Sequence, residues 1–268
     1  AGFLVTFVEA EGHMKGLPVD RVAGLIEAAG DATLTVAGGV ASAEEIAALD
    51  RLGVDTQVGM ALYSGAISLG EAFTAPLVSD RADGLWPTVV VDEHGLCLGL
   101  VYSSPESVAA ALESGRGVYW SRSRNELWEK GASSGATQQL LGVRVDCDRD
   151  ALEFRVRQIG SGFCHLGTRS CFGADAGLPR LARRLAAKIR SDEAASYTKR
   201  LAADQEKRRE KLLEEAAELA DAATPEEVAW EAADVIYFAL VDALSKGVDL
   251  EAIVAQLDRR ERTVRRRH

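Results

Sequence analysis

Residues 33–45 read TLTVAGGVASAEE and join a short β-branched run to a helix start. The run over residues 33–37 is typical of a strand, and a Gly-Gly pair ends it. Ser42 and, three residues later, Glu45 form a capping-box pattern, in which Ser42 caps the helix and Glu45 reaches back to it. A strand followed at once by a helix is the repeating unit of a parallel βα fold.

The same alternation extends over residues 1–72. Residues 3–8 and 54–58 are further strand-like runs, and a helix is expected over residues 18–29. Because strands alternate with helices, we expect a partial, barrel-like βα segment in this part of the chain.

Two changes of pattern divide the rest of the chain. Residues 75–178 predict an α+β module, with strands at residues 89–91, 96–101 and 152–156 and one helix at residues 105–114. Residues 179–268 are rich in Ala, Glu, Leu, Lys and Arg and predict a small all-α bundle, in which Thr224 caps one helix and Asp249 opens the last. The expected fold class is therefore multidomain.

Composition and charge limit the class of protein. The chain has 268 residues, of which 47% are hydrophobic and 27% charged, as in typical globular proteins. A net charge of −10 disfavours general binding to nucleic acid. The arginine-rich residues 259–267 favour a solvated helix end or a linker over a phosphate-binding arm. No run of about 18 apolar residues and no secretory signal is visible. We therefore expect a cytoplasmic protein without a membrane or nucleic-acid partner.

Residues 146–150 read DCDRD and place Asp146, Asp148 and Asp150 at alternate positions. On a strand these carboxylates share one face, and Cys147 points to the other. Acids crowded on one face repel one another unless a cation neutralises them, and hard oxygen ligands suit Mg²⁺. The sequence therefore predicts a Mg²⁺ site at these acids.

Three of the four cysteines, Cys147, Cys164 and Cys171, are candidate zinc ligands. Three thiolates leave one position open for water, which is the arrangement of catalytic zinc. Zinc lowers the pKa of that water, and His165 could move protons for it. A closed structural zinc site and buried free thiols are the alternatives. The fourth cysteine, Cys97, is assigned to the core.

Residues 119–135 are dense in groups that bind phosphate esters. Arginine, lysine and serine side chains and glycine amides supply the donors that a phosphate needs, and Trp120 and Trp128 could stack on a base. The alternative is a solvated loop with two core tryptophans. The candidate substrate-binding residues are Trp120, Ser121, Arg122, Ser123, Arg124, Lys130 and Ser134.

These motifs together resemble phosphoribosyl-AMP cyclohydrolase of histidine biosynthesis. The matching residues are WSRSR at 120–124, WEKGASSG at 128–135, DCDRD at 146–150, and the pairs CH and SC at 164–165 and 170–171. The resemblance implies a homodimer whose zinc is held by three cysteines, two from one subunit and one from its partner. It also implies that the three aspartates bind Mg²⁺ and that His165 assists proton transfer.

The helical part carries a second set of acids. Glu215 with Glu218, and Glu231 with Asp234, are each spaced to share one helix face. Two such helices packed face to face would form a Mg²⁺ site for a nucleoside polyphosphate. A solvated acidic face is the alternative, but apolar neighbours such as Trp230 predict that the second helix is largely buried.

This segment resembles phosphoribosyl-ATP pyrophosphohydrolase, of the all-α MazG-like class. The match rests on residues 196–201, 211–218 and 231–237. The resemblance implies that Glu215 and Glu218 are catalytic, that the four acids bind Mg²⁺, and that Lys211 meets substrate phosphates.

The N-terminal segment resembles the last three βα units of the isomerase barrel of the same pathway. Residues 36–40 and 58–63 match its two phosphate-binding loops, but Phe7 stands where the family has a catalytic Asp. Three strands cannot close an eight-stranded barrel, so we expect a non-catalytic remnant or the end of a longer barrel. The order of all three parts is similar to the front of the fungal histidine trifunctional protein.

The resemblances imply a bifunctional hydrolase. It would hydrolyse phosphoribosyl-ATP to phosphoribosyl-AMP and pyrophosphate, and then open the adenine ring at N1–C6 with the help of zinc. The alternatives are a general nucleotide pyrophosphohydrolase fused to a zinc deaminase-like module, and a metal-stabilised scaffold without activity.

Overall fold

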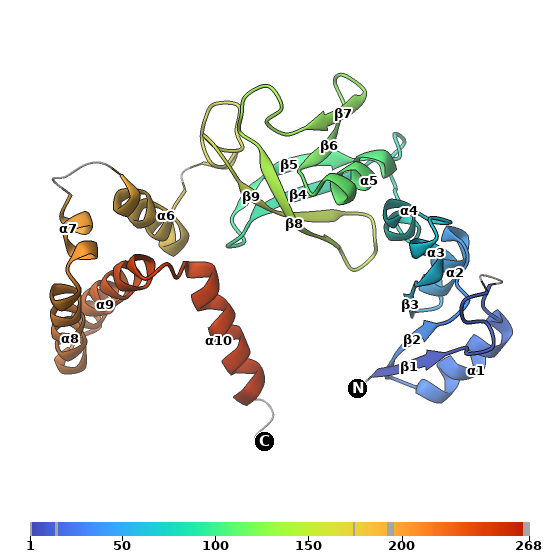
Figure 1. Ribbon diagram of the computed structural model, residues 1–268, viewed down its shortest axis with the longest axis horizontal. Helices are drawn as coiled ribbons and strands as arrows, with labels where there is room; N and C mark the ends of the chain where they lie inside the picture. The colour runs from blue at the N-terminus through green and yellow to red at the C-terminus, as the bar shows by residue number, and fades with distance from the viewer. Residues whose placement is uncertain (1, 14–15, 174, 192–195, 265–268) are drawn as a thin grey trace. The chain divides into compact units, whose positions relative to one another are not determined.

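The computed structural model of the chain describes residues 2–13, 16–173, 175–191 and 196–264 (Figure 1). It divides into two units, Ala1–Gly173 and Ala174–His268. The first unit is mixed α/β and the second is helical. Within the described ranges, none of the helices is long and apolar enough to cross a membrane.

A three-stranded parallel sheet begins the first unit. Its strands pair in the order β1 (Gly2–Thr6), β2 (Thr33–Ala37) and β3 (Val54–Gln57). The helices of this part are α1 (Val19–Ala29), α2 (Ala43–Arg51), α3 (Met60–Tyr63) and α4 (Leu69–Thr74). The predicted alternation of strands and helices is therefore confirmed.

The start of α2 differs in one contact from the predicted capping box. Glu45 N donates to Ser42 Oγ at 3.3 Å, as expected. The Glu45 carboxylate accepts instead from Ala41 N at 2.9 Å and from Leu17 N. It therefore ties the start of α2 to the loop before α1, which is a tertiary contact that the local pattern does not contain.

A four-stranded sheet forms the second part of this unit. Its strand order is β5-β4-β9-β8, with β4 parallel to β9 and the outer pairs antiparallel. The strands are β4 (Trp86–Asp92), β5 (Cys97–Ser103), β8 (Gln138–Val145) and β9 (Leu152–Gln158). A two-stranded ribbon and one helix accompany them, namely β6 (Val118–Ser121), β7 (Glu126–Glu129) and α5 (Pro105–Ser114).

The strands that the sequence predicts are the ones buried in this core. Val90 of β4 and Phe154 and Val156 of β9 are fully buried. Strands β6, β7 and β8 were not predicted. Two of these carry many exposed positions, because β7 has only half-buried and exposed residues and β8 only one buried residue, so their apolar patterns are weak.

Helices α4 and α5 pack closely and join the two parts of the first unit. A Cβ atom placed on Gly70 of α4 would lie 2.4 Å from the Cβ of Ala109 in α5. This distance is shorter than any ordinary contact, so only glycine fits at this position. The N-terminal sheet is thus attached to the larger sheet through a helix contact.

We expect Gly70→Ala to destabilise the first unit by about 1–3 kcal/mol, because the added methyl group would force α4 and α5 apart. Gly24→Ala in α1 is the matched control, since its Cβ would meet nothing within 4 Å. Alanine is the better helix former, so this control should stabilise by about 0.5–1 kcal/mol. Thermal unfolding of both variants measures the difference, and equal melting temperatures would contradict the contact.

The second unit contains helices only, among its described residues. They are α6 (Gly177–Arg190), α7 (Tyr197–Ala203), α8 (Gln205–Asp221), α9 (Pro225–Ser245) and α10 (Leu250–Val264). The predicted caps form, because Glu227 N donates to Thr224 Oγ1 at 3.2 Å and Ala252 N donates to Asp249 Oδ1 at 2.9 Å. Residues 265–267 of the arginine-rich segment lie outside the described residues.

The prediction that the helix now seen as α9 is largely buried was wrong. Phe238, Leu240 and Val241 lie in the core, but Trp230 is 71% exposed. The residues at the start of α9, from 225 to 230, are all exposed. Large apolar side chains are exposed on this helix, namely Val228 and Trp230 in its first turns and Ile236 further along.

Candidate metal and substrate sites

The three aspartates of the DCDRD motif lie in a turn, residues 146–151, and not on a strand as predicted. We call this segment the acidic turn. Strand β8 ends at Val145, and the chain then turns back into β9. The turn is closed by Asp146 Oδ1, which accepts from Asp150 N at 3.1 Å and from Ala151 N at 3.2 Å. The acids are therefore brought together by the turn, and not by sharing one face of a strand as the alternating pattern suggested.

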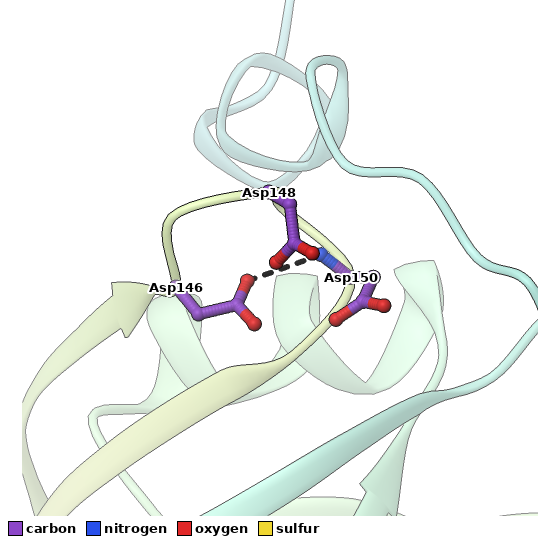
Figure 2. A group of neighbouring side chains, drawn as sticks. All are labelled: Asp146, Asp148 and Asp150. Atoms are coloured by element: carbon purple, nitrogen blue, oxygen red, sulfur yellow. Dashed lines mark hydrogen bonds between the residues drawn. The ribbon is translucent and has the colours of Figure 1, made fainter.

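Figure 2 shows the carboxylates of Asp146, Asp148 and Asp150 gathered on this turn. One oxygen atom of each lies within 4.8 Å of the others. The negative charge of Asp148 raises the pKa of Asp150 above its ordinary value, with a smaller contribution from burial. Mutually repelling carboxylates at this spacing could hold a divalent cation.

Two of the predicted zinc ligands, Cys164 and Cys171, lie close together on the loop that follows β9, residues 159–173, which we call the cysteine loop. Their thiols interact, and hydrogen bonds from the backbone of Leu166 and from Thr168 lower the pKa of Cys164. Burial raises the pKa of Cys171, and the neighbouring Cys164 adds to this effect. The Nδ1 atom of His165 lies 3.9 Å from Cys164 Sγ.

The third predicted ligand, Cys147, lies apart from this pair. It belongs to the turn between β8 and β9, whereas Cys171 N donates to Leu98 O of β5 at 2.8 Å. Strand β4 separates β5 from β9, and adjacent strands are ~4.8 Å apart. Within the described part of the chain, none of the groups of three potential metal ligands includes a cysteine.

The cysteine loop is held by a buried ion pair that the sequence analysis missed. Arg169 donates to Asp92 Oδ2 through Nε at 3.2 Å and Nη2 at 2.8 Å. The other carboxylate oxygen accepts from the backbone of His94 and Leu96, which closes the turn between β4 and β5. An Asp at a strand end before a Gly-containing turn is the available signal, although it does not identify Arg169 as the partner.

The WSRSR segment borders a shallow cavity of about 460 Å³ on the surface of the first unit. Its predicted substrate-binding residues there are Trp120, Ser121, Arg122 and Ser123. The guanidinium group of Arg122 lies 3.8 Å from the centre of the Tyr102 ring. Arg124 does not line this cavity and pairs with Glu126 at 2.9 Å.

The two tryptophans of this segment are half-buried. Trp120 and Trp128 both line the cavity, and Trp128 also packs against the hydrophobic core. Trp128 also contacts the ring of buried Tyr119, with ring centres 5.9 Å apart. Each tryptophan thus has one side in contact with the protein and another that faces the cavity.

Lys130 lies beside the cysteine loop and does not line the cavity of WSRSR. It is 7% exposed, and its Nζ donates to Ala136 O at 3.4 Å. Burial lowers its pKa, while the charges of Cys171 and Cys164 oppose that shift. Ser134 is exposed and its hydroxyl accepts from Ala136 N at 3.3 Å.

In the second unit, α8 and α9 bring the predicted acids together. Glu215 is 6% exposed, and one oxygen of Glu215, Glu231 and Asp234 lies within 4.8 Å of the others. Glu218 is exposed and contacts Glu231. Burial raises the pKa of Glu231, and the charges of Glu218 and Glu215 add to this.

A lysine side chain accompanies this acidic group. Lys211 Nζ lies 2.7 Å from a Glu214 oxygen and 3.0 Å from a Glu215 oxygen. Hydrogen bonds to Glu214 and Glu215 raise the pKa of Lys211. A cation therefore already lies against the acids, on the side of α8.

The two glycine-containing loops of the N-terminal sheet meet at one cavity of about 230 Å³. Gly38 and Gly39 line it from the end of β2, and Gly59 lines it from the end of β3. Phe7 is 3% exposed and packs in the core, where the guanidinium of Arg21 lies 5.1 Å from its ring centre. A side chain placed in this way offers no group for proton transfer.

Family models match three consecutive parts of the chain. Residues 1–68 match the family described as histidine biosynthesis protein. Residues 99–173 match phosphoribosyl-AMP cyclohydrolase, and residues 178–261 match phosphoribosyl-ATP pyrophosphohydrolase. The acidic turn and the cysteine loop lie within the second match, and the acids of α8 and α9 lie within the third.

Curated relatives match most of the chain. The histidine biosynthesis bifunctional protein his7 of Schizosaccharomyces pombe is 50% identical over 201 residues, which is 75% of this chain and 48% of the relative. The histidine biosynthesis trifunctional protein of Neurospora crassa is 48% identical over 227 residues, covering 85% of this chain and 26% of the relative. The chain thus spans about half or less of these two proteins.

A third relative is covered almost completely. The histidine biosynthesis bifunctional protein HisIE of Synechocystis is 40% identical over 210 residues, which is 73% of this chain and 98% of the relative. The chain therefore belongs to the family of histidine biosynthesis bifunctional proteins.

Proposed function

We propose that the chain catalyses two consecutive hydrolytic steps of histidine biosynthesis. The helical unit would cleave phosphoribosyl-ATP to phosphoribosyl-AMP and pyrophosphate. The α/β unit would then add water at C6 of the adenine ring and break the N1–C6 bond. The observation that carries the proposal is that each of the two matched enzyme segments contains its own converging group of carboxylates.

The donor sets support two kinds of metal. Carboxylate oxygens at Asp146, Asp148 and Asp150, and at Glu215, Glu231 and Asp234, suit Mg²⁺, with Glu218 close to the second group. The thiols of Cys164 and Cys171 suit Zn²⁺, with Cys147 as the third ligand. Zinc would supply an activated water molecule for ring opening. His165 would take or return a proton, and Glu215 and Glu218 would act in pyrophosphate release.

Each unit would bind its own substrate. In the α/β unit, Trp120 and Trp128 offer faces for base stacking, and the cationic Arg122 and the hydroxyls of Ser121 and Ser123 suit phosphate. Lys130 would act from its position beside the cysteine loop. In the helical unit, Lys211 is close enough to the acids to exchange a carboxylate for a phosphate oxygen.

A homodimer is part of the proposal. Cys164 and Cys171 would come from one chain, and the third ligand would be Cys147 of the partner subunit. The separation of Cys147 from the pair across the sheet supports this arrangement. The exposed apolar side chains at the start of α9 support dimer formation as well, because a second chain could cover Trp230.

We propose functional parts at residues 1–72, 75–178 and 179–268, and a MazG-like arrangement for the last. The parallel β1-β2-β3 sheet supports a barrel-derived first part, and buried Phe7 supports its lack of isomerase activity. A cytoplasmic location agrees with four cysteines that are all free.

The proposal is tested by supplying phosphoribosyl-ATP with Mg²⁺ and Zn²⁺ and measuring pyrophosphate and ring-opened product separately. We expect both products, and ring-opened product also from phosphoribosyl-AMP alone. Comparable or faster turnover of ordinary nucleoside triphosphates would favour a general nucleotide pyrophosphohydrolase instead. Neither product with any of these substrates would contradict the enzymatic assignment.

A further inference from the structure

The acidic turn contains a cation of its own, and this cation is held by the N-terminal segment. Arg149 lies between Asp148 and Asp150 in the sequence, and its Nε donates to Asp50 Oδ2 of α2 at 2.5 Å. Its Nη2 also contacts Asp50 Oδ1, so the pair is bidentate. The two side chains are 34% and 20% exposed, which makes this a partly buried contact between residues 99 positions apart.

The backbone of Arg149 is fixed by the same surroundings. Its φ of 67° lies in the left-handed region, which is unfavourable for a residue with a Cβ. Its carbonyl oxygen accepts from Val78 N at 3.0 Å, and Val78 O accepts from Trp86 Nε1 at 2.6 Å. Because Trp86 is 5% exposed, these bonds attach the turn to a rigid part of the unit.

Asp50 is itself well anchored. Its neighbour Leu49 is 1% exposed and packs in one core with Ala72 of α4. Helix α4 is in turn fixed against α5 through the close approach of Gly70 and Ala109. The carboxylate that holds Arg149 is therefore attached to the larger sheet through packed helices.

The charges give this contact a consequence for cation binding. A free guanidinium next to Asp148 and Asp150 would pair with these carboxylates and compete with a divalent cation. Asp50 supplies an alternative carboxylate in a bidentate geometry, outside the turn. The contact thus satisfies Arg149 without using the acids that face one another.

We propose that the N-terminal βα segment positions the acidic turn, with Asp50 holding Arg149 away from the acids so that a divalent cation can bind them. Asp50 is a positioning residue, because it acts through Arg149 and not on the substrate. The inference rests on the proposed function, in which this turn binds Mg²⁺. It gives a role to a segment whose own proton-transfer position is occupied by Phe7.

The test measures Mn²⁺ binding, as a probe of the Mg²⁺ site, by electron paramagnetic resonance of the full chain. Glu215→Gln and Glu231→Gln are introduced in every sample to remove binding at the helical acids. In this background we expect Asp50→Asn to weaken Mn²⁺ binding about fivefold, which corresponds to ~1 kcal/mol. Asp55→Asn, an exposed acid of the same segment, is the control and should leave binding unchanged.

A second substitution separates positioning from simple loss of structure. Asn tolerates the left-handed region, so Arg149→Asn removes the competing cation with little backbone cost. Adding Arg149→Asn to Asp50→Asn should restore the Mn²⁺ affinity of the background chain. Unchanged binding in Asp50→Asn, or a loss that Arg149→Asn does not restore, would overturn the inference.

The metal assignment itself is checked separately with Asp148→Asn. If the background chain binds Mn²⁺ no better than this variant does, the Mg²⁺ site of the proposed function fails, and the inference fails with it. If Asp148→Asn removes binding but Asp50→Asn has no effect, only the inference fails. In the otherwise native chain, Asp50→Asn should raise the Mg²⁺ concentration needed for ring opening and leave pyrophosphate release unchanged.

Discussion

Glutamine in place of Glu215 is expected to lower pyrophosphate release from phosphoribosyl-ATP at least ~100-fold. Glu215 is 6% exposed and shares a group of three acids with Glu231 and Asp234. The substitution keeps the shape of the side chain but removes its charge, so the remaining carboxylates bind Mg²⁺ less well. Pyrophosphate release at saturating substrate and Mg²⁺ is the measurement.

The two activities of one chain provide the control. Ring opening of supplied phosphoribosyl-AMP should be unchanged in Glu215→Gln, because that reaction is assigned to the other unit. Glu206→Gln, at an exposed position of the same helix, should leave both activities intact. Normal pyrophosphate release by Glu215→Gln would contradict the site, and equal loss of both activities would indicate misfolding of the whole chain.

Local signals in the sequence predict local structure well. The strand over residues 33–37 and the helix over residues 105–114 have the predicted bounds, and Ser42, Thr224 and Asp249 cap the helices that follow them. Each of these features depends on residues within one or two turns of chain. Their physical causes therefore lie within a short stretch of sequence.

The acidic turn illustrates what a local pattern leaves open. Alternating aspartates are compatible with a strand and with a tight turn, and both arrangements bring the acids together. Asp146 closes the turn locally, and distant segments hold it as well, since Arg149 is bonded to Asp50 and Val78 in its left-handed conformation. Neither partner is recognisable from residues 146–150 alone.

The candidate site residues show the same limit. Lys130 and Arg122 belong to adjacent motifs, but the chain turns between them, so Lys130 lies against the cysteine loop and Arg122 against Tyr102. Arg169 was missed because its importance comes from Asp92, 77 residues earlier. The sequence shows which residue types are present in each motif. The packing of distant segments against one another decides which groups each side chain contacts.

Mixed dimers are expected to recover ring opening from two inactive chains. Cys147→Ser and Cys164→Ser should each lower ring opening at least ~1000-fold, because each removes one zinc thiolate from every site. If each site takes Cys147 from one subunit and the other two thiols from its partner, a dimer of the two variants contains one intact site. Such a dimer, purified with a different tag on each chain, should have about half of the wild-type activity.

A second pairing distinguishes a shared zinc site from a general effect of mixing subunits. Cys164 and Cys171 lie on the same loop of one chain, so a dimer of Cys164→Ser with Cys171→Ser has a damaged loop at both sites. We expect this dimer to be as inactive as its parents. Recovery in the first pairing alone requires that Cys147 act across the interface, since a site built within one chain would leave both mixed dimers inactive. Pyrophosphate release should stay at the wild-type level in all of these dimers, because no cysteine is part of the helical unit.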